Sequence, residues 1–458
     1  MELPQRFAAQ MKEELGSAWD DFAASYEDKA WRGYRWNLTK LHACQKEEFA
    51  HWEMTMAEDA GEKIPCTPVD WCPNGRYLAD ETMTKDPLHF AGAYYIQEPS
   101  AMLPAALLQA QPGDRVLDLC AAPGGKSTQL LDQMGDQGLL VSNDISASRA
   151  KAIVKNMERF GYGQILVTAE SPDKLAVAFP EFFDKILVDA PCSGEGMFRR
   201  EPSMRQEWEE KGPDFYQPIQ REILTQAVAM LRPGGRLVYS TCTFCQAEDE
   251  DNAAWLLETF PDLRLLEDHK IMPHTHKGEG QYAALLEKQL PQDQEETVSF
   301  GKGERGKKNG MANFKEKGNE AVMEFFRLVD KTVWTDTTNW YLKDEQLYAL
   351  PMDLTPWKKL RFLRTGLLLG QVKKGRFEPS QALAMYLTGE QFANTVDFAR
   401  GDERILRYLK GETVEADGAD HKGKNGWCLV LADGLPLGWA KRTGDTLKNK
   451  YEPGWRYQ

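Results

Sequence analysis

Two cysteines, Cys192 and Cys242, each follow a short apolar run that is typical of a buried strand. Cys192 lies in Asp189-Ala-Pro-Cys-Ser-Gly, and Cys242 lies in Ser240-Thr-Cys-Thr-Phe. A lone cysteine is usually a small buried hydrophobe, but two thiols at corresponding strand ends, beside an acid, favour catalysis. A thiolate that adds to C6 of cytosine makes C5 nucleophilic enough to accept a methyl group, after which a base must remove the C5 proton. Such covalent catalysis depends on a thiol pKa below its free value of about 8.5.

A glycine-containing turn precedes these cysteines in the chain and has the composition of a ligand-binding loop. It follows the run Val116-Leu-Asp-Leu and consists of Cys120, Ala121, Ala122, Pro123, Gly124, Gly125 and Lys126. Glycine lets the backbone approach a ligand closely, and the start of the helix that follows offers unpaired N–H groups. The spacing is neither that of a P-loop nor Gly-x-Gly-x-x-Gly. Structural turns explain most isolated Gly-Gly pairs, so the neighbouring acids decide the interpretation.

Three acids stand where successive predicted strands end. Asp144 closes Leu139-Leu-Val-Ser-Asn-Asp, at the position where doubly wound nucleotide-binding proteins keep an acid for the ribose hydroxyls. Glu170 follows Ile165-Leu-Val, and Asp189 ends Lys185-Ile-Leu-Val-Asp. Carboxylates gathered at one edge beside such a turn predict a nucleoside-bearing ligand such as S-adenosylmethionine.

The apolar runs that carry these residues alternate with helical patterns from about residue 115 to 290, the last run being Arg236-Leu-Val-Tyr-Ser. Strand, crossover helix and strand in repetition predict an α/β protein with a doubly wound parallel sheet. Ligands of such sheets bind outside the carboxyl ends of the strands. The predicted sheet therefore brings the turn, the acids and both thiols to one edge.

The remainder of the chain suggests additional domains, since 458 residues are too many for one core and correspond to about three domains. Apolar residues spaced from Leu3 to Phe22 predict an amphipathic helix over about residues 3–26. Turn-rich segments near the carboxyl end predict short strands of a small barrel. The expected units are 1–90, 91–290, a polar and glycine-rich linker at 291–320, and 321–458.

The charge balance, 56 Lys and Arg against 70 Asp and Glu with a net charge of −14, weakens the idea of a nucleic-acid partner without excluding it. Basic residues nevertheless gather locally. Seven cations and no acid lie between Pro356 and Phe377, and Lys441 and Arg442 lie near the carboxyl end. Arg32 and Arg35 alternate with aromatic residues, either to pack against sugar-phosphate or as a basic surface strand. Both interpretations stay open, because charge runs are usually solvated faces.

Two classes of protein are disfavoured by what the sequence lacks. No apolar run reaches the roughly 18 to 20 residues that a bilayer requires, and the start has no signal-peptide pattern, so we expect a cytoplasmic protein without membrane contact. The eight cysteines are then expected to be reduced thiols. Cys66 and Cys72 lack a second pair, so we expect no metal site.

Three motifs together resemble the signature of the Sun/nucleolar-protein family of RNA cytosine-5 methyltransferases. They are Asp118-Leu-Cys-Ala-Ala-Pro-Gly-Gly-Lys126, Asp189-Ala-Pro-Cys-Ser-Gly194 and Ser240-Thr-Cys-Thr-Phe244. Glu195-Gly-Met-Phe-Arg-Arg200 and a late Gly-Trp-Ala-Lys-Arg segment are similar to the bacterial RsmF (YebU) branch, which methylates small-subunit ribosomal RNA. The resemblance implies a Rossmann-like methyltransferase domain between a small N-terminal α+β domain and a C-terminal PUA-like barrel, both gripping RNA.

The resemblance also implies a role for each matching residue. Cys242 would be the nucleophile and Cys192 would serve product release, an order that the residues alone leave open. Asp189 would lie close to the methyl donor and the cytosine. The cofactor loop would run from Cys120 to Lys126, with Asp144 on the ribose and Glu170, where the family usually has Asp, near the adenine. Residues expected to grip the RNA backbone are Arg32, Arg35, Arg199, Arg200, Lys441 and Arg442.

Cys245 departs from the family pattern and creates Cys242-x-x-Cys245. This pair predicts inactivation by oxidants rather than a redox function, because thioredoxin-type motifs occur at a helix start in a different context. The expected substrate is unpaired or flipped ribosomal RNA, free or in the small subunit, and the expected enzyme is a monomer that depends on S-adenosylmethionine. Transfer RNA as substrate and a non-catalytic RNA-binding assembly factor are the alternatives. Cysteines at both motif positions argue against the second.

Overall fold

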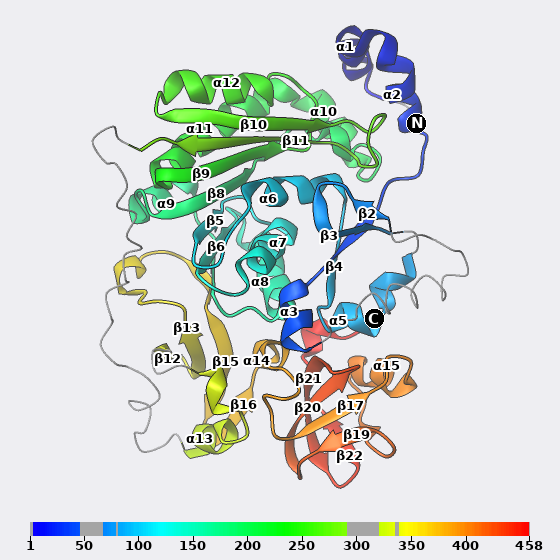
Figure 1. The fold of residues 1–458 in the computed structure, drawn as a ribbon, viewed down its shortest axis with the longest axis vertical. Coiled ribbons are helices and arrows are strands. Elements are labelled where there is room, and N and C mark those ends of the chain that lie inside the picture. Colours follow the sequence, from blue (N-terminus) through cyan, green and yellow to red (C-terminus); the bar gives the residue numbers. More distant parts are fainter. Residues whose placement is uncertain (1–2, 46–66, 79–80, 291–319, 335–338, 458) are drawn as a thin grey trace.

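The computed structural model describes residues 3–45, 67–78, 81–290, 320–334 and 339–457. Its centre is an eight-stranded sheet of order β10-β11-β9-β8-β5-β6-β7-β14 (Figure 1). The strands are β5 (Arg115–Asp118), β6 (Leu139–Asn143), β7 (Ile165–Thr168), β8 (Phe183–Asp189), β9 (Leu231–Thr241), β10 (Leu263–Ile271), β11 (Gln281–Lys288) and β14 (Phe362–Thr365). The five predicted runs are β5 to β9, and these are joined in parallel, so the doubly wound α/β prediction is confirmed.

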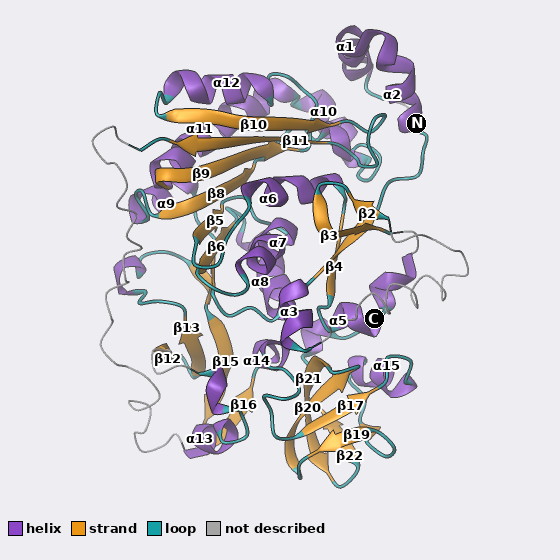
Figure 2. Ribbon diagram, in the orientation of Figure 1, coloured by secondary structure: helices purple, strands orange, loops and turns teal. Residues whose placement is uncertain are grey.

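Helices cover both faces of this sheet (Figure 2). One face packs against α6 (Leu103–Leu108), α7 (Gly125–Met134) and α8 (Ala147–Phe160), and the other against α9 (Pro172–Ala178), α11 (Pro213–Met230) and α12 (Glu250–Thr259). Successive side chains of a strand point to opposite faces, and accordingly Val116 lies in the first core and Leu117 in the second. Burial on both faces explains why these strands are continuous apolar runs in the sequence.

Both edges of the sheet depart from a purely parallel arrangement. β11 pairs antiparallel with β9 and with β10, and at the opposite edge β14 pairs antiparallel with β7. β14 comes from the basic segment near the carboxyl end. The residues before it are fixed by Trp357, whose Nε1 donates to the Ala178 carbonyl at 2.9 Å and whose ring lies 4.9 Å from that of Phe179. The central sheet is therefore completed from outside the expected 91–290 unit.

The N-terminal unit is α+β, but its details differ from the expectations. Its sheet has the order β2-β3-β1-β4, with β1 (Gly33–Trp36), β2 (Pro68–Val69), β3 (Cys72–Tyr77), β4 (Tyr94–Gln97), α3 (Leu38–Ala43) and α5 (Pro87–Phe90). Because β4 pairs with β1, this sheet extends past the expected boundary at residue 90. The helix predicted over 3–26 is interrupted by a 3-10 turn at Gly16–Ala18, which separates α1 (Gln5–Leu15) from α2 (Trp19–Ser25).

The carboxyl-terminal region contains two further sheets. The first, of order β12-β13-β15-β16, has β12 (Asn339–Lys343), β13 (Gln346–Leu350), β15 (Leu367–Lys373), β16 (Arg376–Pro379), α13 (Glu320–Phe326) and α14 (Gln381–Tyr386). The second, of order β18-β22-β21-β20-β17-β19, has β17 (Thr395–Phe398), β18 (Val414–Glu415), β19 (Asp420–Lys422), β20 (Gly426–Ala432), β21 (Leu435–Thr443), β22 (Thr446–Asn449) and α15 (Glu403–Leu409). The expected linker lies outside the described residues except for Glu320, which begins α13.

Within the described ranges, none of the helices combines the length and the apolar character needed to span a bilayer.

Candidate active site

Cys192 and Cys242 lie side by side at the carboxyl edge of the central sheet. β8 and β9 are parallel neighbours with Asp189 opposite Ser240, so the residues just beyond the two strands meet. The two Sγ atoms are 3.4 Å apart. Cys192 is 8% exposed, and its hydrogen bond with Cys242, together with burial, raises the pKa of Cys192 well above its usual value. Cys192 therefore holds a proton that the two sulfurs can share.

Hydrogen bonds hold the two cysteine loops together. The Ser193 hydroxyl contacts that of Thr243 at 2.7 Å, and the Gly196 N–H donates to the Cys242 carbonyl at 2.9 Å. The Ser193 N–H donates to Glu248 Oε2 at 3.0 Å. Because the two loops contact each other directly after the cysteines, the thiols have a fixed relative position.

The glycine-containing loop reaches the cysteines through an ion pair. Lys126, in the first turn of α7, contacts Asp189 with 2.7 Å between Nζ and Oδ2. The other carboxylate oxygen accepts hydrogen bonds from Ser240 at 2.8 Å and from Gln281 at 3.1 Å. Burial opposes the charge on Lys126, but Asp189, with a smaller contribution from Cys242, raises the pKa of Lys126 overall. The loop is thus tied to Asp189 and Ser240, which precede Cys192 and Cys242 by three and two residues, at one edge of the sheet.

The loop from Cys120 to Lys126 has features that fit a bound ligand. Gly124 has a φ of 109°, a left-handed conformation that favours glycine, and α7 begins without a side-chain cap. Beneath the loop, Asp118 Oδ1 is buried with no hydrogen-bond partner among the described residues, while Oδ2 accepts from Ser127 at 2.5 Å. Burial raises the pKa of Asp118 to about 7. A ligand can form hydrogen bonds with the free N–H groups at an uncapped helix start and with a buried oxygen that has no protein partner.

The two acids expected at the nucleoside lie at the ends of β6 and β7. Asp144 is 2% exposed, accepts from the Ser146 N–H at 2.9 Å and contacts Arg149 at 3.3 Å. Glu170 is 7% exposed, accepts from the Arg361 backbone N–H at 2.6 Å and contacts Lys174 at 3.2 Å. Both oxygens of Glu170 thus have protein partners, so its expected place near the adenine stays a prediction.

Asn143 is a residue that the sequence did not single out. Its amide nitrogen donates to the carbonyls of Leu119 and Glu170 at 3.2 and 3.0 Å, and its oxygen accepts from Thr168 at 2.8 Å. One side chain therefore ties together the residues that follow β5 and β7. The only indication of this role in the sequence is its position directly before Asp144 in the predicted strand.

Two buried carboxyl groups beside the cysteines were also missed. Glu248 accepts from Ser193 and Gln220, and burial raises its pKa to about 7. Glu195 accepts from the Phe244 N–H at 2.8 Å and from Trp208 Nε1 at 3.0 Å, and burial raises its pKa as well. Both lie within a few residues of a motif cysteine, and Glu195 also begins the Glu195-Gly-Met-Phe-Arg-Arg200 motif, but the sequence did not indicate a role for either side chain.

Three arginines expected to grip RNA are occupied inside the protein, and this expectation is corrected. Arg35 is 0% exposed and donates from Nη2 to the Gly125 carbonyl at 3.0 Å. The Arg199 side chain is 4% exposed and pairs with Glu279 at 2.8 Å. Arg442 is 8% exposed and donates to the Gly444 carbonyl at 2.8 Å. Arg35 lies in β1, which is buried along its whole length, so neither surface interpretation holds for Arg35, whereas Arg32 precedes the strand and is partly exposed.

The remaining candidates, Arg32, Arg200 and Lys441, are at least partly exposed. Arg200 donates to the Trp31 carbonyl at 3.3 Å, and Lys441 Nζ lies 4.8 Å from the centre of the Trp427 ring. Their contact with RNA stays a prediction.

Cys245 is buried away from solvent, and burial raises its pKa to about 12. Its sulfur accepts a long contact of 3.9 Å from Gln10 Nε2. The sulfur that lies 3.4 Å from that of Cys242 belongs to Cys192. In an oxidised protein we therefore expect Cys192, rather than Cys245, to form a disulfide with Cys242. Cys66 lies outside the described residues, and in the part of the chain that the structure describes no cluster of three metal-ligating side chains occurs.

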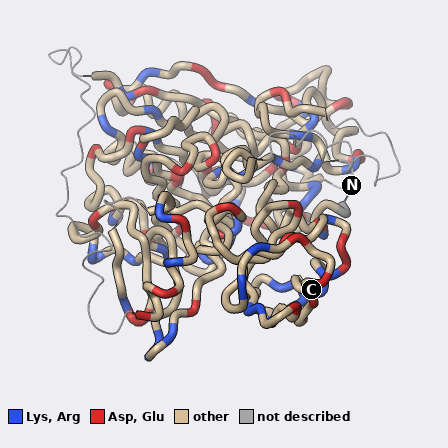
Figure 3. The backbone as a smooth tube through the Cα atoms, turned by 60° about the horizontal axis from the view of Figure 1, so that its bottom comes forward, with Lys and Arg blue, Asp and Glu red and all other residues tan. Residues whose placement is uncertain are grey.

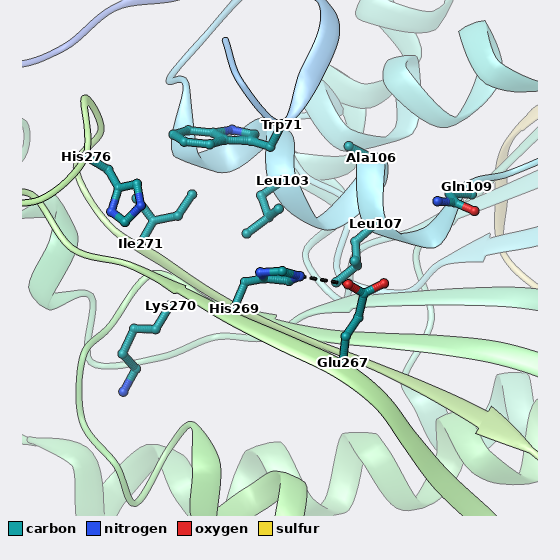
Figure 4. Close-up of a pocket in the computed structure, with 10 residues that line it drawn as sticks. All are labelled: Trp71, Leu103, Ala106, Leu107, Gln109, Glu267, His269, Lys270, Ile271 and His276. Atoms are coloured by element: carbon teal, nitrogen blue, oxygen red, sulfur yellow. Dashed lines mark hydrogen bonds and ion pairs between the residues drawn. The ribbon is translucent and has the colours of Figure 1, made fainter.

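A separate cavity of about 340 Å³ lies beside the edge strand β10 (Figure 4). Trp71, Leu103 and His269 are among its lining residues, and His269 contacts Glu267 at 3.0 Å. Neither motif cysteine nor any residue of the glycine-containing loop lines this cavity, so it is distinct from the candidate active site.

Four family models match the chain in succession. The N-terminal domain of 16S rRNA methyltransferase RsmF matches residues 3–99, and 16S rRNA methyltransferase RsmB/F matches residues 105–298. The first C-terminal domain of RsmF rRNA methyltransferase matches residues 324–387, and the methyltransferase RsmF PUA domain matches residues 395–457. The expected methyltransferase domain and PUA domain are therefore confirmed, with a separate domain between them.

Individual relatives match nearly the whole chain. Ribosomal RNA small subunit methyltransferase F of Cronobacter sakazakii is 31% identical over 482 residues, which cover 98% of this chain and 95% of the relative. The protein of that name from Shigella boydii is 30% identical over 481 residues, with the same coverage. Among solved structures, a methyltransferase homologue from Pyrococcus horikoshii is 27% identical, with a TM-score of 0.51 over 60% of this chain and 92% of that chain.

Proposed function

Because the chain belongs to the RsmF family of 16S rRNA methyltransferases, we propose that it methylates C5 of cytosine in small-subunit ribosomal RNA, with S-adenosylmethionine as the methyl donor. The observation that carries this proposal is the pair of sulfurs 3.4 Å apart, beside the ion pair that ties Asp189 to Lys126 of the glycine-containing loop. A methyltransferase that acts on oxygen or nitrogen needs no such pair, whereas C5 of cytosine is unreactive until a nucleophile adds to C6.

The cofactor would be held by the loop from Cys120 to Lys126 and by Asp144. The uncapped start of α7 and the orphaned Asp118 oxygen support this placement. When bound, S-adenosylmethionine supplies an electrophilic methyl group. Asp144, already oriented by Ser146 and Arg149, would accept hydrogen bonds from the ribose hydroxyls.

The side chains around the cysteines support a covalent mechanism. The charge of Lys126 interacts with Cys242. In this mechanism the Cys242 sulfur attacks as a thiolate and forms a bond to C6, so that electron density reaches C5. After C5 is methylated, the Cys192 thiolate removes the C5 proton, and the bond between C6 and Cys242 breaks to restore the aromatic ring and the thiolate. Once Cys242 has bonded to C6, the largest cause of the raised Cys192 pKa, its hydrogen bond with Cys242, is gone, and Cys192 releases its resting proton to solvent before it acts as the base.

The proposal is tested by methyl transfer from labelled S-adenosylmethionine to small-subunit ribosomal RNA, followed by digestion to nucleosides. We expect the label in 5-methylcytidine, and Cys245→Ala should retain transfer because its sulfur is outside the reacting pair. Preferential labelling of transfer RNA would favour the alternative substrate. RNA binding without transfer to either RNA would favour a non-catalytic assembly factor.

A further inference from the structure

A second cleft, of about 740 Å³, lies between the first carboxyl-terminal sheet and the segment that leads into β14. Its volume falls in the range of ligand pockets, about 300 to 1,000 Å³. One wall is the segment 353–365, and the other is one face of β12 and β13. The opposite face of these strands carries Trp340, Leu347 and Ala349, which pack in the core beneath. Because successive side chains of a strand point to opposite faces, the residues between these core residues face the cleft.

Two tyrosines form the floor of this cleft. Tyr341 on β12 and Tyr348 on β13 are direct cross-strand partners, and the Cβ atoms of such partners lie about 4.5 to 5.5 Å apart. Tyr341 is 45% exposed. Within the described ranges, no other aromatic ring packs against either tyrosine. The sheet thus places two adjacent aromatic side chains at the cleft.

Four cations and one acid line the same cleft: Lys343, Lys358, Arg361, Arg364 and Asp353. Arg364 is largely buried and pairs with Glu158. The other three cations are exposed, and none of them forms an ion pair with any residue that the structure describes. Elsewhere basic and acidic residues are interspersed along most of the chain (Figure 3), whose net charge is −14. The cleft is therefore a local positive site on an acidic protein.

We propose that this cleft binds a nucleotide of single-stranded RNA, with its base on Tyr341 and Tyr348 and its phosphates at Lys343, Lys358 and Arg361. Stacking platforms flanked by cations are how proteins hold unpaired strands without reading their sequence. An acidic peptide would satisfy the charges and leave the tyrosine faces uncovered. The inference rests on the RNA substrate proposed above, to which it adds a contact outside the active site.

The position of the cleft relative to the active site supports this assignment. The Arg361 carbonyl accepts from the Ala169 N–H at 3.0 Å, and its own N–H donates to Glu170. One wall of the cleft is thereby fixed to the carboxyl end of β7, and the cysteines follow β8 and β9 on the same edge. A strand held at Arg361 lies on the edge of the sheet at which the target base must be presented.

The test measures binding of a fluorescein-labelled single-stranded RNA decamer to the full chain, without methyl donor, by fluorescence anisotropy. The double variant Tyr341→Ala/Tyr348→Ala should raise Kd by about 5- to 150-fold, the usual effect of removing base stacking. The double variant Lys358→Gln/Arg361→Gln should reduce the slope of log Kd against log salt by about 0.7 per lost phosphate contact.

Two matched controls should bind as the wild type does. Leu342→Ala removes an exposed apolar side chain from β12 that does not line the cleft, and Lys374→Gln removes an exposed cation from the same basic segment, also outside the cleft. Thermal unfolding of each variant verifies that it is folded. Equal Kd values for the wild type and the tyrosine variant, or an equal loss in the controls, overturn the proposal.

An abasic strand separates stacking from charge. It should bind the wild type and the tyrosine variant alike, and a persistent dependence on the tyrosines would exclude base stacking. Methyl transfer is scored separately. A protein that binds RNA through the tyrosines but methylates none refutes the proposed function, whereas a protein that methylates RNA without any dependence on the tyrosines refutes the cleft.

Discussion

Cys192 and Cys242 share one contact but stand in different surroundings. Cys192 is buried with a raised pKa, whereas Cys242 is partly exposed and interacts with Lys126. We expect Cys242→Ala to form no covalent RNA adduct, because it lacks the sulfur that we propose attacks C6. Cys192→Ala should accumulate an adduct, since it can attack C6 but cannot remove the C5 proton. Denaturing gels with labelled RNA measure both, and the reverse pattern would contradict the assigned order.

The short distance between these sulfurs also predicts sensitivity to oxidants. Diamide should join Cys192 to Cys242, with loss of methyl transfer that dithiothreitol restores, because formation of a disulfide needs only a small approach of the two sulfurs. Peptide mapping by mass spectrometry identifies the bond. Cys245→Ala should be inactivated as fast as the wild type. A bond found at Cys245 instead, with oxidant resistance in Cys245→Ala, would restore the pairing expected from the sequence.

Glu248 makes stability depend on pH in a predictable direction. Its pKa is about 7 in the folded protein because of burial, against about 4.5 for an ordinary Glu. The protonated form therefore favours the fold, and this contribution is full below about pH 4.5 and is lost as pH rises through about 7. Relative to Glu248→Gln, the free energy of unfolding of the wild type should fall by up to about 3 kcal/mol between about pH 5 and pH 8. Urea titrations measure it, and a constant difference would contradict the assignment.

At the level of elements, Glu170 and the segment before β14 depend on each other. Glu170→Ala removes the acceptor of the Arg361 N–H, so we expect faster amide hydrogen exchange over residues 355–365. Lys174→Ala is the matched control, because it removes only the exposed partner of Glu170, and such pairs contribute about 0 to 1 kcal/mol. Equal exchange in Glu170→Ala and the wild type would show that β14 is held without this contact.

The strands β5 to β9 could be predicted from the sequence because burial on both faces produces continuous apolar runs. β14 could not be predicted, since Phe362–Thr365 lies in a basic segment and becomes a strand only through pairing with β7, far away in the sequence. The break at Gly16 was also missed. The apolar stripe continues from Phe7 to Phe22 although the backbone changes direction between them.

The motif cysteines, Asp189 and Lys126 could be predicted as neighbours because all follow strands of one sheet or begin a helix at its edge. The sequence could not show in this way which basic residues are buried and which are exposed. Arg35 and Lys441 have the same charge in the sequence, but one donates to the backbone of α7 inside the protein and the other is exposed over Trp427. Only the packing of β1 against α7 distinguishes them.

For the whole molecule, the carboxyl-terminal residues complete the core of the central domain. Leu354, Trp357 and Phe362 pack against that core, and β14 covers the edge of β7. A chain that ends at residue 290 should therefore unfold at a lower temperature than the full chain and aggregate through the open edge. Light scattering during a thermal ramp measures both effects. A fragment as stable and as monodisperse as the full chain would contradict this dependence.

The origin of β14 has a consequence for synthesis of the protein. Phe362 follows Thr168, its partner on β7, by 194 residues (362 − 168). A ribosome that adds about 5 to 20 residues per second needs roughly 10 to 40 s to cover that interval. Throughout that time the nascent chain carries β7 as an open edge and Glu170 without the Arg361 amide. Chaperone protection is therefore most needed during this interval. A chain that terminates before Phe362 keeps β7 as an open edge permanently.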